Sequence, residues 1–82
     1  MVKVRFTSHL IQALGARETD VDARTVRELL KALSGRYGKP FDDRVDACKV
    51  IVNGTNVAFL KGTGTALADG DEVVLLPPMA GG

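Results

Sequence analysis

One amphipathic segment, from Thr25 to about Gly38, constrains the fold of this chain most strongly. Thr25 and Glu28 form a capping-box pattern, in which each side chain satisfies a backbone N–H group at the start of a helix. Apolar side chains then recur at helical spacing on one face, at Val26, Leu29, Leu30, Leu33 and Tyr37. The helix should end near Gly38, because Pro40 disfavours helical backbone at the residue before it. We therefore predict one main helix that buries this face, Leu30 included.

Short strand patterns precede this helix. Residues Val2 to about Ser8 alternate apolar and polar side chains, which is the period of a half-buried strand. We expect a short helical turn over His9 to Gly15, and then a polar edge strand over Arg17 to Asp22, whose charges discourage pairing with another molecule. After the helix, the polar stretch from Phe41 to Asp46 predicts a solvated loop.

The second half of the chain has further strand patterns. A β-branched run over Lys49 to Asn53 ends in Asn53-Gly54, a strong hairpin signal, so a partner strand should follow at about Asn56 to Leu60. The last strand should run from Asp71 to Leu76. This order predicts an α+β fold in which a mixed sheet of about five strands packs on one main helix.

Four apolar residues in succession, Val73 to Leu76, stand in the last predicted strand. A sheet covered by one helix has a single dry face, so two of the four side chains should look outward. Two interpretations stay open. The strand is central and covered on both sides by loops, or it presents an apolar patch that docks a partner protein.

Size and charge exclude several classes of protein. With 82 residues the chain has room for one small domain, and 45% apolar and 26% charged residues are ordinary for a globular protein. A net charge of +1 and few aromatic residues argue against nucleic-acid binding. We find no signal peptide and no apolar run of membrane-spanning length. A single cysteine fits a reducing compartment, so we predict a cytoplasmic protein with no membrane partner.

Few residues inside the chain suggest catalysis. Cys48 and His9 are the only cysteine and histidine, too few soft ligands for a zinc site. Cys48 is expected to be a buried small hydrophobe and His9 a solvent-facing or capped residue. Gly62-Thr63-Gly64 has no following Lys-Ser/Thr, so a loop is favoured over a phosphate cradle. We expect no autonomous active site, no bound cofactor and no metal.

The C-terminus is the remaining candidate. Pro77 and Pro78 lack an N–H group and should end sheet pairing, which divides the chain into a domain over 1–76 and an extended arm over 77–82. Gly81 and Gly82 carry no Cβ, so a narrow channel of another protein can admit them.

The closing residues 67–82 resemble the signature of the MoaD/ThiS sulfur carriers, an L-x-D-G-D-x-V run followed by P-P-x-x-G-G. The Val52-Asn53-Gly54 turn, the opening strand and the Thr25-Val26 helix start strengthen the resemblance, which covers nearly the whole chain. The segment from Phe59 to Leu67 is similar to the MoaD-like branch that includes small archaeal modifiers. Met79-Ala80 departs slightly from the usual pattern. The resemblance implies a ubiquitin-like β-grasp fold.

The resemblance also implies a function. In the family an E1-like adenylating enzyme of the MoeB/ThiF type uses ATP and magnesium to activate the terminal glycine, and a sulfurtransferase then supplies sulfur to form a thiocarboxylate. Gly82 would carry this group here. The partner-binding residues would be the arm and the strand end before it: Leu75, Leu76, Pro77, Pro78, Met79, Ala80 and Gly81.

Three outcomes of this activation fit the resemblance. The leading one is the small subunit of a molybdopterin synthase, a non-catalytic sulfur donor to a pterin precursor held by a MoaE-like large subunit. The alternatives are a ubiquitin-like modifier joined through Gly82 to lysines of other proteins, and a sulfur carrier for thiamin or tRNA thiolation.

Overall fold

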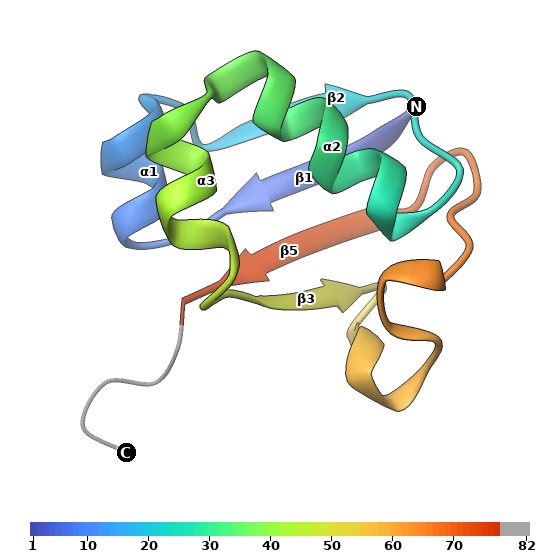
Figure 1. The fold of residues 1–82 in the computed structure, drawn as a ribbon. Coiled ribbons are helices and arrows are strands. Elements are labelled where there is room, and N and C mark those ends of the chain that lie inside the picture. Colours follow the sequence, from blue (N-terminus) through green and yellow to red (C-terminus); the bar gives the residue numbers. More distant parts are fainter. Residues whose placement is uncertain (78–82) are drawn as a thin grey trace.

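A mixed sheet with strand order β2-β1-β5-β3-β4 forms one layer of the protein (Figure 1). The computed structural model describes residues 1–77. Strand β5 lies at the centre of the sheet, parallel to β1 and antiparallel to β3. The strands are β1 (Val2–Phe6), β2 (Glu18–Val21), β3 (Lys49–Val52), β4 (Thr55–Asn56) and β5 (Glu72–Leu76). The predicted α+β fold with a mixed five-stranded sheet is confirmed.

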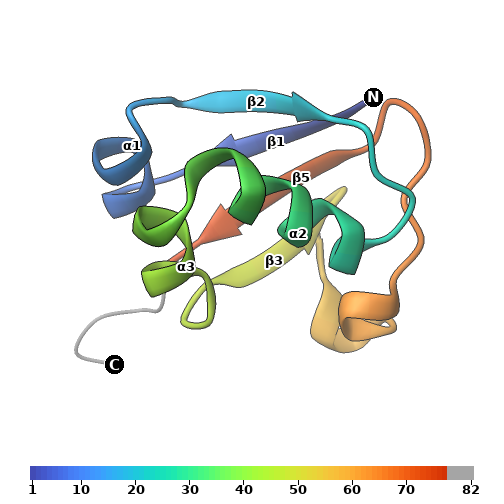
Figure 2. The same cartoon turned by 45° about the horizontal axis from the view of Figure 1, so that its top comes forward.

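Helices cover one face of this sheet and leave the other face open, as Figures 1 and 2 show from two directions. They are α1 (His9–Leu14), α2 (Val26–Tyr37) and α3 (Lys39–Val45). Alternate residues of β1 and β5 point toward the helices, and Val4, Leu33 and Val73 are fully buried between the two layers. No helix within residues 1–77 is long and apolar enough to cross a membrane.

Helix α2 begins as predicted. The Thr25 hydroxyl accepts a hydrogen bond from the backbone N–H of Glu28 at 3.2 Å. The Glu28 carboxylate accepts in return from the N–H of Arg24 at 3.1 Å, one residue earlier than in the usual capping box. Val26, Leu29 and Leu33 are buried, whereas Leu30 and Tyr37 are only half-buried. The expectation of a buried Leu30 is therefore wrong, because this residue lies at the margin of the packed face.

The segment from Phe41 to Asp46, predicted as a solvated loop, lies mostly in helix α3. Gly38 adopts a positive φ of 68°, and its carbonyl accepts hydrogen bonds from the N–H groups of Phe41 and Asp42, both at 3.0 Å. Pro40 stands in the first turn of the new helix, where its missing N–H costs nothing. Phe41 is 1% exposed and packs into the core. The proline that ends α2 therefore also starts α3.

The partner strand predicted over Asn56 to Leu60 is much shorter than expected. Strand β4 ends at Asn56, whose side-chain oxygen accepts from the N–H of Ala58 at 2.9 Å and caps a 3₁₀ helix, η1 (Val57–Phe59). A second 3₁₀ helix, η2 (Gly62–Gly64), follows. The Asn56 side chain binds a backbone N–H group that could otherwise pair with the neighbouring strand, and this competition shortens β4.

Candidate functional site

The root of the C-terminal segment is held firmly. Strand β5 is paired on both sides, with Val74 between Arg5 of β1 and Ile51 of β3. The hydroxyl of Thr7 donates a hydrogen bond to the carbonyl oxygen of Leu75 at 2.8 Å. Pro77 follows outside the strand and is half-buried. The last described residues thus leave the sheet from a rigid central strand.

The two faces of β5 differ in what they contact. Val73 and Leu75 are both 0% exposed and pack under the helices. Leu75 was expected to contact a partner, but its side chain belongs to the core, and we leave it out of the proposed partner surface. Val74 and Leu76 point to the open face and are half-buried.

An apolar patch forms on the open face of the sheet. Ile51 lies directly opposite Val74 in the antiparallel register, and Leu76 is the next residue of β5 on the same face. We call Ile51, Val74 and Leu76 the open-face patch. This position favours the interpretation that the apolar run of β5 forms a docking surface. The strand is also central, as the interpretation of a covered strand predicted.

Charged side chains border the open-face patch. The guanidinium of Arg5 lies 3.3 Å from the carboxylate of Glu72 and 3.9 Å from that of Glu18, so these charges form a row across three strands. A hollow of about 460 Å³ opens beside this row, and its lining includes Arg5, Arg17 and Val74. The open face therefore combines an apolar centre with a charged border, the usual composition of a transient protein interface.

Cys48 and His9 lie near the root of the C-terminal segment. Both line a hollow of about 230 Å³ together with Arg44 and Pro77. The thiol of Cys48 donates to the carbonyl oxygen of Arg44 at 3.3 Å, and burial raises the pKa of this thiol. A protonated, hydrogen-bonded thiol is a poor nucleophile. Cys48 is only half-buried, however, and not buried as predicted, because its position before β3 lies at the edge of the core. Within the described residues, no cluster of three or more His, Cys, Asp or Glu side chains is arranged to hold a metal ion.

The remaining predicted site residues, Pro78, Met79, Ala80, Gly81 and Gly82, lie outside the described residues. Their roles, and the arm over 77–82, stay predictions. Two residues of the open face were not predicted as site residues, Ile51 and Arg5. The alternation in the first strand indicates that Arg5 faces outward, whereas the continuous apolar run over 50–52 gives no such signal for Ile51. Only the register places both residues beside Val74.

Comparison with known proteins identifies the family. The sequence profile of the ThiS family matches residues 4–82. The chain belongs to the ThiS family. It is thus a member of the ubiquitin-like sulfur carriers and modifiers, and the resemblance noted in the sequence is confirmed.

Two relatives of this ThiS-family chain carry different functional names. A protein of Archaeoglobus fulgidus, provisionally named a sulfur carrier protein, is 33% identical over 99% of this chain and 98% of its own length. Small archaeal modifier protein 3 of Haloferax volcanii is 34% identical over the same shares of the two chains. The relatives therefore include both a carrier and a modifier.

Solved structures confirm the β-grasp fold of this ThiS-family protein. A chain of the BexX/CysO complex from Amycolatopsis orientalis matches all of it with a TM-score of 0.86 and 26% identity, and the match covers 100% of that chain. A chain of the complex of subunits 1 and 2 of molybdopterin-converting factor from Helicobacter pylori has a TM-score of 0.71 and 26% identity over 99% of this chain and 97% of that chain. Both structures are complexes with a partner protein.

Proposed function

We propose that this protein is the small, sulfur-carrying subunit of a molybdopterin synthase. The observation that carries the proposal is the rigid central strand β5, which leads from the core directly into a segment that ends in Gly81-Gly82. The similarity to the molybdopterin-converting factor complex supports the choice of a pterin precursor as the sulfur acceptor. A MoaE-like large subunit would hold that precursor, and this chain would supply no active site of its own.

The chemistry starts at the carboxylate of Gly82. A terminal carboxylate with a pKa near 3.5 is ionised at neutral pH and is a poor acyl donor. An E1-like adenylating enzyme uses ATP and magnesium to form an acyl-adenylate and releases pyrophosphate. A hydrosulfide ion, released from the persulfide of a sulfurtransferase by a thiol reductant, then displaces AMP and leaves a thiocarboxylate. Its sulfur attacks a carbon of the pterin precursor and displaces an oxygen leaving group. Water then hydrolyses the resulting thioester, which leaves the sulfur on the pterin and restores the carboxylate.

The open-face patch is the proposed contact with these enzymes. Val74 and Leu76 lie on the strand that precedes Pro77, so a partner that binds them also has the following residues within reach. We extend the proposed contact to Pro77, Pro78, Met79, Ala80 and Gly81. The partially exposed side chains of the patch are apolar, and their burial would give the encounter its specificity, because a net charge of +1 offers little long-range attraction.

Transfer of sulfur to the terminal glycine, carried out with purified components, tests this proposal. Purified protein is incubated with an E1-like adenylating enzyme, ATP, magnesium and a sulfide source, and intact mass spectrometry follows the terminal group. We expect one terminal oxygen to be replaced by sulfur, and the loaded protein to convert a pterin precursor when a MoaE-like subunit is present. Deleting Gly82 should abolish loading and leave the unfolding transition unchanged.

Two variants distinguish binding at the open-face patch from the reaction at Gly82. Val74→Ser should raise the KM of the adenylating enzyme for this protein with a smaller effect on kcat, because it removes part of the docking surface. Phe59→Ser, in the 3₁₀ helix η1 and outside the residues that define the patch, is the matched control and should load normally. Loading that fails with every adenylating enzyme tried, in protein shown to be folded, contradicts sulfur carriage.

The similarity to small archaeal modifier protein 3 favours a second candidate, a modifier joined through Gly82 to lysines. The same adenylate serves both reactions, so the products must be compared. Antibodies against the folded domain should detect slow-migrating conjugates in native cells if the protein is a modifier, and mass spectrometry should find Gly82 linked to a lysine side chain. Loading with sulfur but no pterin conversion would instead point to thiamin or tRNA thiolation.

A further inference from the structure

The last peptide unit of β5 is held from both sides within the sheet. On one side, Leu76 pairs with Lys49 of β3. On the other side, the hydroxyl of Thr7 donates a hydrogen bond to the carbonyl oxygen of Leu75 at 2.8 Å. Thr7 lies directly after Phe6, the last residue of β1, so a side chain binds β5 where the neighbouring strand has already ended. Contacts on both sides therefore fix the direction of the chain at Leu76.

The Thr7 hydroxyl takes the place of a backbone donor. In the parallel pair of β1 and β5, the N–H of Lys3 donates to the carbonyl oxygen of Asp71 at 2.9 Å. A parallel ladder repeats this bond at every second residue, so in the same register the N–H of Thr7 would donate to Leu75. The chain turns toward α1 at this point, and the side chain of Thr7 makes the bond instead. Without the hydroxyl, the Leu75 carbonyl would have no donor on the β1 side.

The turn that follows Thr7 is strained. Ser8 has a φ of 47° and a ψ of −123°, a conformation that favours glycine. The carbonyl oxygen of Thr7 accepts from the N–H of Leu10 at 3.1 Å, so Ser8 occupies the first central position of a turn, where type II′ geometry usually requires glycine. A strained residue persists only where surrounding contacts hold it, and such residues cluster at functional sites. The bond between Thr7 and Leu75 is one of the contacts that hold this turn.

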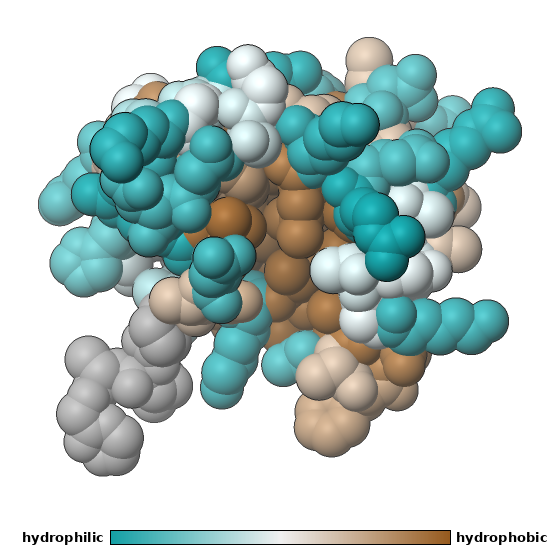
Figure 3. All heavy atoms as spheres, viewed as in Figure 1, coloured by the Kyte–Doolittle hydropathy of each residue, from teal (hydrophilic) through white to brown (hydrophobic). Residues whose placement is uncertain are grey.

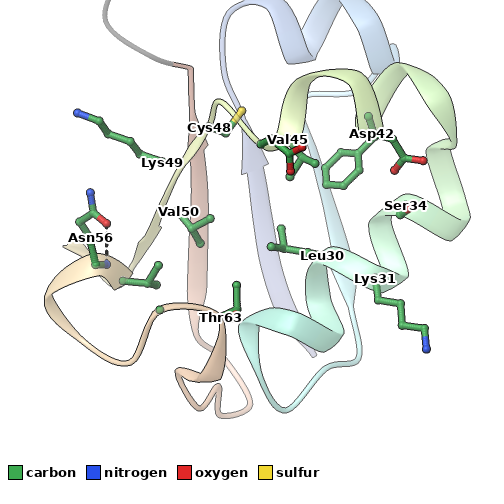
Figure 4. A pocket seen from close by; sticks show the side chains of 15 residues that line it. Leu30, Lys31, Ser34, Asp42, Val45, Cys48, Lys49, Val50, Asn56 and Thr63 are labelled. Carbon is green, nitrogen blue, oxygen red and sulfur yellow. Dashed lines mark hydrogen bonds between the residues drawn. The ribbon is translucent and has the colours of Figure 1, made fainter.

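Open space adjoins the end of β5 on the helical side of the sheet. An apolar groove of about 760 Å³ lies between α2, α3 and β3, and Figure 3 shows its hydrophobic floor. In Figure 4, Leu30 and Val50 stand on opposite walls of the groove, and Cys48 lies at the end of β3. Cys48 lines both this groove and the hollow of about 230 Å³ beside Pro77. These spaces leave room for the chain to turn, so the hydrogen bonds at the end of β5 must set its direction.

We propose that Thr7 is a positioning residue for the reaction at Gly82, because its hydroxyl sets the direction in which the chain leaves the sheet. This inference rests on the proposed function. Gly82 lies six residues beyond Leu76, a span of at most about 20 Å, over which a tilt of about 10° displaces the terminal carbon by about 3 Å. The fixed φ angles of Pro77 and Pro78 help to transmit such a tilt. A misplacement of about 1 Å is enough to slow a reaction between positioned groups.

The kinetics of adenylation test this role. Pyrophosphate release is measured with an E1-like adenylating enzyme that loads the wild type, over a range of concentrations of this protein. Thr7→Val keeps the shape of the side chain and removes the donor, so kcat should fall roughly tenfold. KM should stay within about twofold, because the open-face patch is unchanged. Thr7→Ser keeps the hydroxyl and should restore most of kcat.

The motion of the strand end gives a second readout that does not depend on the enzyme. The amide of Leu76 belongs to the same peptide unit as the Leu75 carbonyl, and ¹⁵N relaxation of the full chain reports its order parameter. We expect a lower order parameter in Thr7→Val than in the wild type or Thr7→Ser. Asn53→Ala is the matched control for lost stability, because Asn53 binds the opposite end of β5. It should keep the wild-type kcat and the wild-type order parameter of Leu76.

Several results would overturn the positioning role of Thr7. They are a wild-type kcat in Thr7→Val, a Thr7→Ser variant as slow as Thr7→Val, and an equal loss of kcat in Asn53→Ala, which would trace the effect to stability. A rise in KM alone would place Thr7 in docking, and an unchanged order parameter at Leu76 would show that the hydroxyl does not hold the strand end. Wild-type protein that no adenylating enzyme loads contradicts the proposed function itself and removes the reaction that Thr7 would serve.

Discussion

The side-chain amide of Asn53 donates a hydrogen bond to the carboxylate of Asp71 at 3.1 Å, and so joins the turn after β3 to the turn before β5. The Asn53 side-chain oxygen also accepts from the backbone N–H of Glu72 at 3.0 Å. Asn53 and Gly54 both adopt positive φ angles, 49° and 88°, as a tight left-handed hairpin turn requires. The V-N-G and D-G-D segments of the sequence therefore meet in one network at the start of the strand that carries the C-terminal segment.

Replacing Asn53 should weaken this network. Asn53→Ala removes two side-chain hydrogen bonds and puts a residue with a poor preference for positive φ into the turn, so we expect a loss of about 1 to 3 kcal/mol in the free energy of unfolding. Urea unfolding measures the change. Thr55→Ala, an exposed position in the same hairpin, should cost much less. Equal stability of the two variants would contradict a structural role for the network.

The hydrogen bonds to Asp71 also make the free energy of unfolding depend on pH in the acidic range. The backbone N–H of Ala68 donates to the Asp71 carboxylate at 2.8 Å, and this bond, followed by the one from Asn53, lowers the pKa of Asp71. A carboxyl whose pKa is lowered by folding stabilises the protein above its unfolded pKa, near 4, and this contribution is lost as the pH falls through the folded value.

We therefore expect Asp71→Asn to reduce the dependence of unfolding free energy on pH between about pH 5 and pH 2. Chemical unfolding at several pH values in this range measures it. Asp46→Asn, at an exposed position on the other side of the molecule, is the control and should keep the wild-type slope. A wild-type slope in Asp71→Asn as well would mean that other carboxyls cause the acid sensitivity.

The amine of Met1 should make the stability of the protein depend on pH in the alkaline range. The amine of Met1 donates to the carboxylate of Asp69, and this hydrogen bond raises the pKa of the amine, while the carbonyl of Met1 accepts from the N–H of Gly70 at 3.0 Å. A group whose pKa is raised by folding stabilises the protein below its unfolded pKa, near 8, and the contribution is lost as the pH rises through the folded value. Acetylation of the amine, or Asp69→Asn, should lower Tm at neutral pH and flatten its decline above pH 8. Calorimetry of the acetylated protein measures both effects.

The two leucines of α2 offer a direct test of burial. Leu33 is 0% exposed, so Leu33→Ala should cost about 2 to 5 kcal/mol. Leu30 is only half-buried at the groove, and Leu30→Ala should cost less than half as much as Leu33→Ala. Denaturant unfolding of both variants under the same conditions measures the two losses in the free energy of unfolding. A loss for Leu30→Ala as large as that for Leu33→Ala would contradict the half-buried position of Leu30.

Helix α3 can be tested through Phe41. Phe41→Ala should cost about 3 to 5 kcal/mol, because its 1%-exposed ring fills the space between the helices and the sheet. A residue in a solvated loop would lose almost nothing. Asp43→Ala, exposed on the same helix, should change the free energy of unfolding only slightly.

Local patterns predicted much of this fold. Alternation identified β1, and an uninterrupted apolar run identified β5. The short helix predicted over His9 to Gly15 forms as α1, and the charged segment after it is the edge strand β2. The errors have a common cause. Pro40 was interpreted as a stop although it also starts α3, and the strand was continued past Asn56 although the side chain of Asn56 caps a 3₁₀ helix there. Each residue type suits two roles, and distant packing partners decide between them.

The amino-acid sequence alone determined the strand and helix propensities, the hairpin turn at Asn53-Gly54 and the diglycine terminus, because these depend on neighbours within a few residues. Only the tertiary structure decided that Ile51 lies against Val74, that Leu75 is buried, and that Phe59 is exposed. The physical reason is that register and packing join residues far apart along the chain, and each side chain takes its role from the neighbours that this pairing brings to it.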